Sequence, residues 1–220
     1  MTIDYALARE LMVEQQVRPW DVLDAAVLEV VGRLPREAFV PEAQRALAYA
    51  DVELPLGNGA RMMKPVVEGR MLQALDLKPG DSVLEVGTGS GYATAGLAAL
   101  AREVVSLEID PELAAAARAR LDATGLGTNV RIETADALHY APSRTFDAVC
   151  VTAAVDTVPT RFLEWLRPGG RLFVVRGRAP AMEAVLLRAT GDVNAPTVES
   201  LFETELEYLR GAEPVPQFSF

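Results

Sequence analysis

The chain has 220 residues, of which 50 % are hydrophobic and 24 % are charged, which is the composition of an ordinary folded protein and not of a disordered one. Its length fits a single domain with one substantial core. Its formal net charge of −10 opposes approach to a polyphosphate backbone, so we expect no nucleic-acid partner.

The chain carries no pattern typical of an export signal or a membrane segment. Asp4, Arg9 and Glu10 precede any apolar run, so a secretory signal is not expected. The longest uncharged stretch near the middle, residues 86–101, is too short to cross a bilayer. The single cysteine, Cys150, lies in an apolar run, which indicates a buried and unreactive thiol. These features predict a cytoplasmic protein without a membrane partner.

The N-terminal region, residues 1–70, is predicted to be helical with short connections. Asp21 is the predicted N-cap of one helix. Pro65 is expected to open another, because proline suits the first helical turn. Prolines and glycines between residues 35 and 59 predict turns. The predicted helices cover residues 4–15, 22–31 and 65–75.

From residue 77 onward, apolar strands alternate with helices. This alternation predicts an α/β fold with a doubly wound, mainly parallel sheet that is covered on both faces. Strands are predicted over residues 82–86, 103–109, 129–133, 147–152, 171–175 and 184–188, and helices over residues 92–101 and 111–125.

The end of the chain is predicted to add an edge strand over residues 198–209. Phe218 and Phe220 are then expected to dock on an apolar surface. We therefore expect one domain over residues 1–220, with an N-terminal helical cap, a ligand-binding core over residues 71–190 and a C-terminal strand and tail over residues 191–220.

A glycine-rich turn joins the first core strand to its helix, which is where an open parallel sheet binds nucleotide-like ligands. Glycine allows the backbone to turn sharply and to approach a ligand without a clash from Cβ. A dinucleotide site would have its third glycine where this chain has Tyr92. The tighter spacing is typical of folds that bind S-adenosylmethionine (SAM), whose carboxylate can meet the helix N-terminus. The predicted cofactor residues here are Glu85, Gly87, Thr88, Gly89, Ser90, Gly91 and Tyr92.

Acidic residues follow the next two predicted strands. Glu108 ends the second strand, where a carboxylate can accept both hydroxyls of a ribose. The alternative is that Glu108 is a solvated charge that caps the following helix. Asp136 follows the third strand and could hold the edge of an adenine, although aspartate is also common in turns. Ile109, Ala137 and Thr152 complete the predicted cofactor set.

Several separate motifs resemble those of the protein-L-isoaspartate O-methyltransferase family. Residues 84–92 (LEVGTGSGY) are similar to its cofactor motif almost letter for letter. The resemblance implies a SAM-dependent enzyme that methylates the displaced carboxylate of isoaspartyl residues in a protein or peptide partner, the first step in repairing aged proteins. The other stretches that resemble the family are residues 12–18, 35–42, 48–51, 146–154 and 166–172.

The segment expected to meet the substrate departs from the family pattern. It reads GARMMKP over residues 59–65, so Met63 stands where the family has its catalytic serine, and Val66 replaces a common histidine. A thioether cannot donate the hydrogen bond with which a hydroxyl would orient the acceptor carboxylate. Arg61 and Lys64 flank this position and could bind an anionic acceptor, or both could be surface charges on a polar loop.

Three hypotheses remain open from the sequence. The first is a carboxyl methyltransferase of the isoaspartyl type. The second is a SAM-dependent methyltransferase with a small-molecule or other acceptor, and the third is a SAM-binding protein that has lost turnover with the serine. A metal site is not predicted, since the chain has one histidine, His139, and one cysteine.

Overall fold

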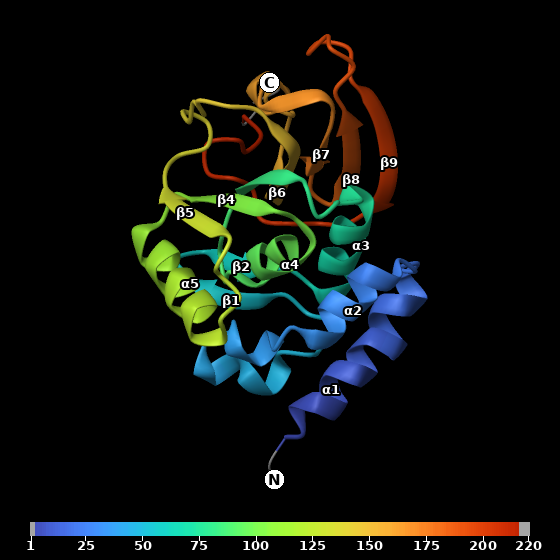
Figure 1. Cartoon of the computed structure of the whole chain (residues 1–220), viewed down its shortest axis with the longest axis vertical. Helices are drawn as coiled ribbons and strands as arrows, with labels where there is room; N and C mark the ends of the chain where they lie inside the picture. Colours follow the sequence, from blue (N-terminus) through green and yellow to red (C-terminus); the bar gives the residue numbers. More distant parts are fainter. Residues whose placement is uncertain (1–2, 216–220) are drawn as a thin grey trace, which may run out of the picture.

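The computed structural model describes residues 3–215, and a seven-stranded sheet forms its centre (Figure 1). In spatial order the strands are β5 (Val130–Thr134), β4 (Glu103–Glu108), β3 (Ser82–Val86), β6 (Phe146–Val155), β7 (Leu166–Arg178), β8 (Ala181–Arg188) and β9 (Thr197–Glu203). The strands from β5 to β7 pair in parallel, and β8 and β9 pair antiparallel with their neighbours. The sheet is that of a Rossmann-like, doubly wound fold, as the sequence predicts.

The N-terminal region is helical, with one correction to the predicted boundaries. Asp4 caps α1 (Tyr5–Met12), which continues into a π-helical turn at Val13–Val17. The second helix, α2 (Ala25–Arg33), begins later than expected because the side chain of Asp24 caps it, accepting from the N–H of Val27. Asp21 is not an N-cap: it has a φ of 59° and ends a short 3₁₀ turn.

A hairpin that the sequence analysis interpreted as turns lies between the helical cap and the core. Strands β1 (Leu54–Gly57) and β2 (Ala60–Met62) pair antiparallel. The two residues between them, Asn58 and Gly59, have φ values of 51° and 80°, which the left-handed region allows for asparagine and glycine. Helix α3 (Pro65–Leu75) follows and begins at the predicted proline.

Three further helices connect the core strands. Helix α4 (Tyr92–Leu100) follows the glycine-rich turn, and α5 (Pro111–Thr124) ends at Gly125, whose φ is 70°. Helix α6 (Thr160–Glu164) is a single short turn after β6.

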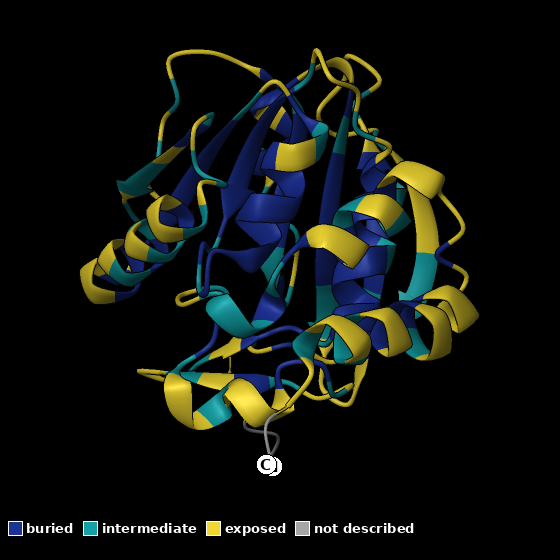
Figure 2. Ribbon diagram, turned by 60° about the horizontal axis from the view of Figure 1, so that its bottom comes forward, coloured by how far each residue is buried: buried dark blue, intermediate teal, exposed yellow. Residues whose placement is uncertain are grey.

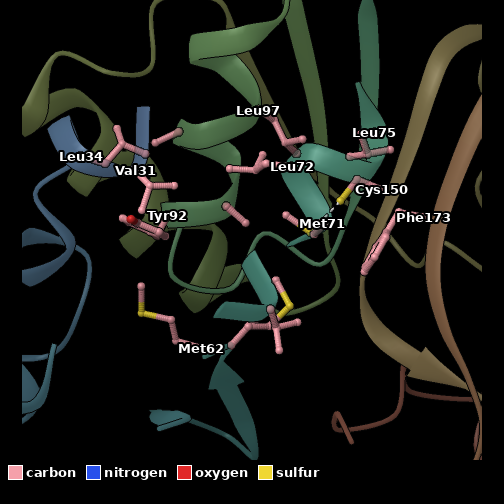
Figure 3. Packing of buried hydrophobic residues seen from close by; sticks show 14 of the residues in the cluster. Val31, Leu34, Met62, Met71, Leu72, Leu75, Tyr92, Leu97, Cys150 and Phe173 are labelled. Carbon is pink, nitrogen blue, oxygen red and sulfur yellow. Dashed lines mark hydrogen bonds between the residues drawn. The ribbon is translucent and has the colours of Figure 1, made fainter. Parts of the chain in front are cut away.

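Apolar side chains cover both faces of the sheet. The neighbouring residues Val83 and Leu84 of β3 belong to different buried clusters, because successive residues of a strand point to opposite faces. Helices α2, α3 and α4 cover the first face (Figure 3), and α6 lies on the second. Figure 2 shows buried central strands and more exposed outer helices. No helix within residues 3–215 has the length and apolar character needed to cross a membrane.

Cys150 lies in the apolar cluster on the first face of the sheet, beside Met71 of α3 (Figure 3). Its side chain is fully buried and its Sγ contacts Sδ of Met71 at 3.2 Å. Burial raises the pKa of this thiol well above its ordinary value. The prediction that this thiol is buried is confirmed, and its low reactivity stays a prediction.

The C-terminal segment differs from the prediction in its second half. The edge strand β9 ends at Glu203, and the chain then returns to the centre of the sheet. There the N–H of Ala154 donates to the carbonyl of Glu207, and the N–H of Leu209 donates to the carbonyl of Ala154, both at 2.8 Å. Phe218 and Phe220 lie outside the described residues.

A buried carboxylate joins α4 to the two central strands. Oε2 of Glu85, in β3, accepts from Thr94 Oγ1 of α4 at 2.6 Å and from Ser106 Oγ of β4 at 2.5 Å. The residue is fully buried, and burial raises the pKa of its carboxyl to about 8, against the two hydrogen bonds that lower it. This raised pKa favours the protonated form of Glu85 at neutral pH.

We expect the stability of the protein to fall with rising pH because of Glu85. The unfolded chain releases this proton near pH 4.5 and the folded chain near pH 8, so between these values the folded state binds more protons. Each pH unit in this window then costs up to about 1.4 kcal/mol. Urea unfolding of wild type and Glu85→Gln from pH 5 to 8 measures the difference. Equal slopes in the two proteins would mean that Glu85 is ionised in the folded state.

Candidate cofactor and acceptor site

The candidate site lies where the strand order reverses. The sheet continues from β3 to β4 and β5 on one side and to β6 and β7 on the other. In an open sheet, the crevice at the carboxyl ends of the strands that flank this reversal is the ligand-binding position. Gly87 follows β3, Glu108 ends β4 and Thr152 lies near the end of β6, so the parallel register brings these three predicted residues together.

The turn after β3 requires glycine. Gly87, Gly89 and Gly91 have φ values of 94°, 53° and 87°, in the left-handed region. A Cβ on Gly87 would come within 2.4 Å of Oγ1 of Thr152. A Cβ on Gly89 would instead point toward Leu56 of the hairpin, at 3.4 Å. The turn thus brings bare backbone to the space between the sheet and the hairpin.

Glu108 fixes the conformation of this turn. Its Oε2 accepts from the N–H of Gly89 at 2.8 Å, and its Oε1 accepts from the N–H of Asp110 at 3.1 Å. Its side chain is buried, with a relative exposure of 6 %. An ionised carboxylate has about four lone pairs, so one acceptor position on each oxygen remains for a ligand. The alternative of a solvated helix cap does not fit, because Asp110 is the residue that caps α5.

Two pockets meet at Glu108. The central pocket is lined on the sheet side by Gly87, Gly89, Glu108, Ile109 and Thr152, and on the other side by Asn58, Arg61, Met63 and residues 206–210. The side pocket shares Gly87, Glu108 and Ile109 with it and is also lined by Asp136 and Ala137. The structure therefore brings seven of the predicted cofactor residues to two adjoining pockets.

The other five predicted cofactor residues lie on the side of the turn that faces away from the pockets. They line neither pocket. Thr88 Oγ1 lies 2.5 Å from Ser106 Oγ, and Ser90 Oγ accepts from the N–H of Tyr92 at 3.1 Å. A Cβ on Gly91 would meet Ala117 of α5 at 3.3 Å. Direct contact of Glu85, Thr88, Ser90, Gly91 and Tyr92 with a cofactor stays a prediction.

Asp136 has a neighbour that the sequence analysis did not connect with the site. Its Oδ2 lies 2.7 Å from Nδ1 of His139, and its Oδ1 accepts from the N–H of Leu138 at 2.8 Å. The contact with His139 is the main reason that the pKa of Asp136 is lowered. In the sequence, the only indication that Asp136 and His139 interact is that they lie three residues apart in one turn.

The hairpin and the segment after it supply the opposite wall. Arg61 and Met63 line the central pocket, whereas Lys64 lines a neighbouring groove. Met63 is almost fully buried, with a relative exposure of 5 %. Nε of Arg61 lies 3.4 Å from Glu207, and both side chains are about half exposed. Such an exposed pair is weak, so Arg61 can exchange this partner for a ligand carboxylate.

Polar contacts that the sequence did not predict tie the walls together across the pocket mouth. Nδ2 of Asn58, at the hairpin tip, donates to Asp110 Oδ2 at 2.8 Å. Nη2 of Arg210 donates to the carbonyl of Asn58 at 3.1 Å. Three segments that are far apart in the sequence thus meet at one place. No periodic pattern or motif marked Asn58 or Arg210, and their roles follow from the tertiary structure alone.

Among the described side chains, no three His, Cys, Asp or Glu residues are grouped so as to hold a metal ion. The polar groups that line the two pockets include carboxylates, guanidinium groups and the backbone of the glycine turn. The acidic residues are Glu53, Glu108, Asp136 and Glu207, and the arginines are Arg61 and Arg210. These groups suit an organic ligand with hydroxyl and carboxylate functions.

Comparison with known proteins agrees with this arrangement. A sequence model of the protein-L-isoaspartate(D-aspartate) O-methyltransferase family matches residues 8–200. The chain is 43 % identical over 184 residues to protein-L-isoaspartate O-methyltransferase 2 of Marinobacter nauticus, covering 83 % of this chain and 84 % of that protein. It is 44 % identical over 187 residues to the protein-L-isoaspartate O-methyltransferase of Methylorubrum extorquens, covering 85 % and 81 %.

Solved structures agree on the fold. A protein-L-isoaspartate O-methyltransferase structure superposes with a TM-score of 0.78 at 23 % identity, covering 91 % of this chain and 65 % of that one. A Plasmodium falciparum structure described as a protein-L-isoaspartate O-methyltransferase in complex with S-adenosyl-L-homocysteine has a TM-score of 0.78 at 17 % identity, covering 94 % and 99 %. With the family match and the relatives above, these findings show that the chain belongs to the protein-L-isoaspartate(D-aspartate) O-methyltransferase family.

Proposed function

We propose that this protein is a SAM-dependent methyltransferase that methylates the side-chain carboxylate of isoaspartyl residues in proteins or peptides. The observation that carries the proposal is the pocket in which the glycine turn and Glu108 face Arg61 and Met63. Relatives with 43–44 % identity bear the name of this activity. One wall suits the cofactor, and the other lies where an acceptor would meet it.

The residues of the sheet side fit SAM. The free acceptor positions of Glu108 suit the two ribose hydroxyls. Gly87 and Gly89 line the central pocket without side chains, and Asp136 and Ala137 lie where the adenine would extend. When bound, SAM supplies a methyl group on a sulfonium, which a carboxylate can accept by in-line displacement without a strong general base.

The residues of the opposite wall would hold the acceptor. The guanidinium of Arg61 can bind one carboxylate oxygen and keep the acceptor ionised. Leu206 and Leu209 line the same pocket and exclude water around it. Positioning and partial desolvation of the carboxylate then supply the rate enhancement.

A protein or peptide acceptor fits the surroundings of the pocket better than a nucleic acid. The neighbouring groove is lined by Asp51, Glu53, Glu203, Glu205 and Glu207, with Lys64 as its cation. Glu205 and Glu207 contribute to the raised pKa of Glu53, after burial as the main cause. A phosphate backbone would meet repulsion there. We also propose that the protein acts in the cytoplasm.

A second candidate is methyl transfer to a different acceptor, and Met63 is the observation that favours it. Its buried thioether occupies the position of the family's serine and cannot orient a carboxylate. A SAM-binding protein without turnover remains the limiting case of this candidate. The two candidate functions use the same cofactor site, so identifying the methyl acceptor distinguishes between them.

We expect Gly89→Val to abolish micromolar binding of SAM and of S-adenosylhomocysteine. A valine would strain the backbone at a φ of 53° and would extend into the space beside Leu56. Isothermal calorimetry measures binding, and circular dichroism checks the fold. Gly80→Val is the control, because Gly80 lies in an exposed turn with open space around it. If folded Gly89→Val bound SAM with unchanged affinity, the cofactor would not bind at this turn.

We expect Glu108→Ala to weaken SAM binding by about 1.5–3 kcal/mol, the range for hydrogen bonds to a charged group. Calorimetry with SAM and with adenine alone separates the ribose contact from the rest of the ligand. Glu112→Ala is the matched control, since Glu112 is an exposed carboxylate in the first turn of α5. A loss of only a few tenths of a kcal/mol for Glu108→Ala would exclude the ribose contact.

We expect weak isoaspartyl methylation by the wild type and a gain with Met63→Ser. One restored hydrogen bond is worth about 1–3 kcal/mol, which corresponds to a gain between several-fold and about a hundredfold. Single-turnover transfer to an isoaspartyl peptide at saturating SAM measures it. Met63→Ala removes the same buried thioether without adding a hydroxyl, and controls for the cavity.

The opposite result would change the assignment of Met63. High wild-type activity that falls in Met63→Ser would make the thioether a fitted part of the acceptor pocket. Absence of transfer in wild type and in both variants, with SAM binding intact, would favour the second candidate function.

A further inference from the structure

One buried cation, Arg36, contacts both Met63 and the first residue of the helix that follows the glycine turn. Arg36 lies in the short 3₁₀ turn Arg36–Ala38 after α2, and its side chain is fully buried. One end of its guanidinium, Nη1, forms an ion pair with Glu68 of α3. The other end, Nη2, donates to the backbone carbonyl of Met63 at 2.5 Å. Arg36 therefore holds the residue at the acceptor position through its main chain.

The same guanidinium also packs against the helix that follows the glycine turn. Its Cζ is 4.7 Å from the ring centroid of Tyr92, the first residue of α4, which directly follows the glycine turn. Phe39 packs on the same ring edge-on, with the centroids 5.7 Å apart. Burial of this tyrosine raises the pKa of its hydroxyl. The neutral ring offers its face to the cation.

An ion pair alone does not explain this placement. Burying a guanidinium and a carboxylate costs several kcal/mol per ion, and apolar side chains of similar volume are often as stabilising. Burial raises the pKa of Glu68 despite the attraction of Arg36, which lowers it. Within the described residues, Nε of Arg36 has no hydrogen-bond partner. The contact that needs the planar fork of arginine is the one to the Met63 carbonyl.

We infer that Arg36 is a positioning residue, which sets the place of Met63 relative to the glycine turn by binding the Met63 carbonyl and packing on Tyr92. The role in turnover rests on the proposed function, whereas the mechanical link does not. Methyl transfer is sensitive to the distance between acceptor and donor, and a misplacement of about 1 Å can cost about a hundredfold in rate.

Two variants separate this role from the ion pair. Arg36→Lys keeps the positive charge beside Glu68 but loses the fork that reaches the Met63 carbonyl. Glu68→Gln removes the ion pair and leaves the Arg36 contact with Met63 intact. If Arg36→Lys does not fold, the double variant Arg36→Met/Glu68→Met replaces both ions by apolar side chains, which need not destabilise the protein.

The first readout is amide hydrogen exchange of residues 59–64, which requires no turnover. We expect exchange to accelerate about ten- to a hundredfold in Arg36→Lys, the equivalent of one lost charge-assisted hydrogen bond, and to change less than about threefold in Glu68→Gln. Equal acceleration in the two variants would overturn the inference in favour of the ion pair. Unchanged exchange in folded Arg36→Lys would overturn it directly.

The second readout is a split of the kinetic parameters. We expect kcat for the isoaspartyl peptide to fall about ten- to a hundredfold in Arg36→Lys while the Kd of SAM changes less than about threefold, because Glu108 anchors the cofactor wall independently. A proportional loss of SAM binding would mean a general structural role. If the wild type transfers no methyl group to the peptide, the proposed function fails, and the exchange comparison still decides the role of Arg36.

Discussion

The parallel pairing of β3 with both β4 and β6 is the constraint on which the site depends. Its hydrogen-bonded ladder pairs Val86 with Leu107 on one side and with Val151 on the other, so the residues that follow these three positions lie at one level. The N–H of Gly87 extends this ladder to the carbonyl of Leu107 at 2.8 Å. The glycine turn, the carboxylate of Glu108 and the hydroxyl of Thr152 come from distant parts of the chain. The pairing of the strands is sufficient to bring them together.

The second wall has a different physical basis. The β1–β2 hairpin is too short to be stable alone and is held by contacts with its surroundings. Asn58 and Arg210 fix its tip by hydrogen bonds, and Arg36 fixes the segment after it through the Met63 carbonyl. The sheet thus carries the side of the pocket with Gly87 and Glu108, whereas the side with Arg61 and Met63 depends on a few polar contacts. This difference suits a site that must admit a large acceptor.

Buried ionisable groups lie on both sides of the glycine turn. Glu85 links β3, β4 and α4 beneath it, and Glu68 pairs with Arg36 beside it. Burial raises the pKa of both carboxyls, to about 8 and about 7. The carboxylate of Glu108 therefore lines the pocket, whereas that of Glu85 is buried behind the turn, where burial disfavours its charged form.

The sequence determined the elements of the core and the cofactor wall. The core was predictable from local patterns: alternating apolar strands and helices, three glycines, and an acidic residue at the end of a strand. Parallel pairing of the strands then brings Gly87, Gly89 and Glu108 to one pocket. The hairpin, the N-cap at Asp24 and the return of residues 206–210 to β6 were not predicted, because short segments of mixed polarity carry no periodic signal. The stretch 35–42 resembled the family, but nothing in the local sequence showed what Arg36 contacts or distinguished the pocket-facing Arg61 from Lys64, since only packing between distant segments sets where a charged side chain lies. Local pattern fixes what each element is, and tertiary contacts decide what each side chain meets.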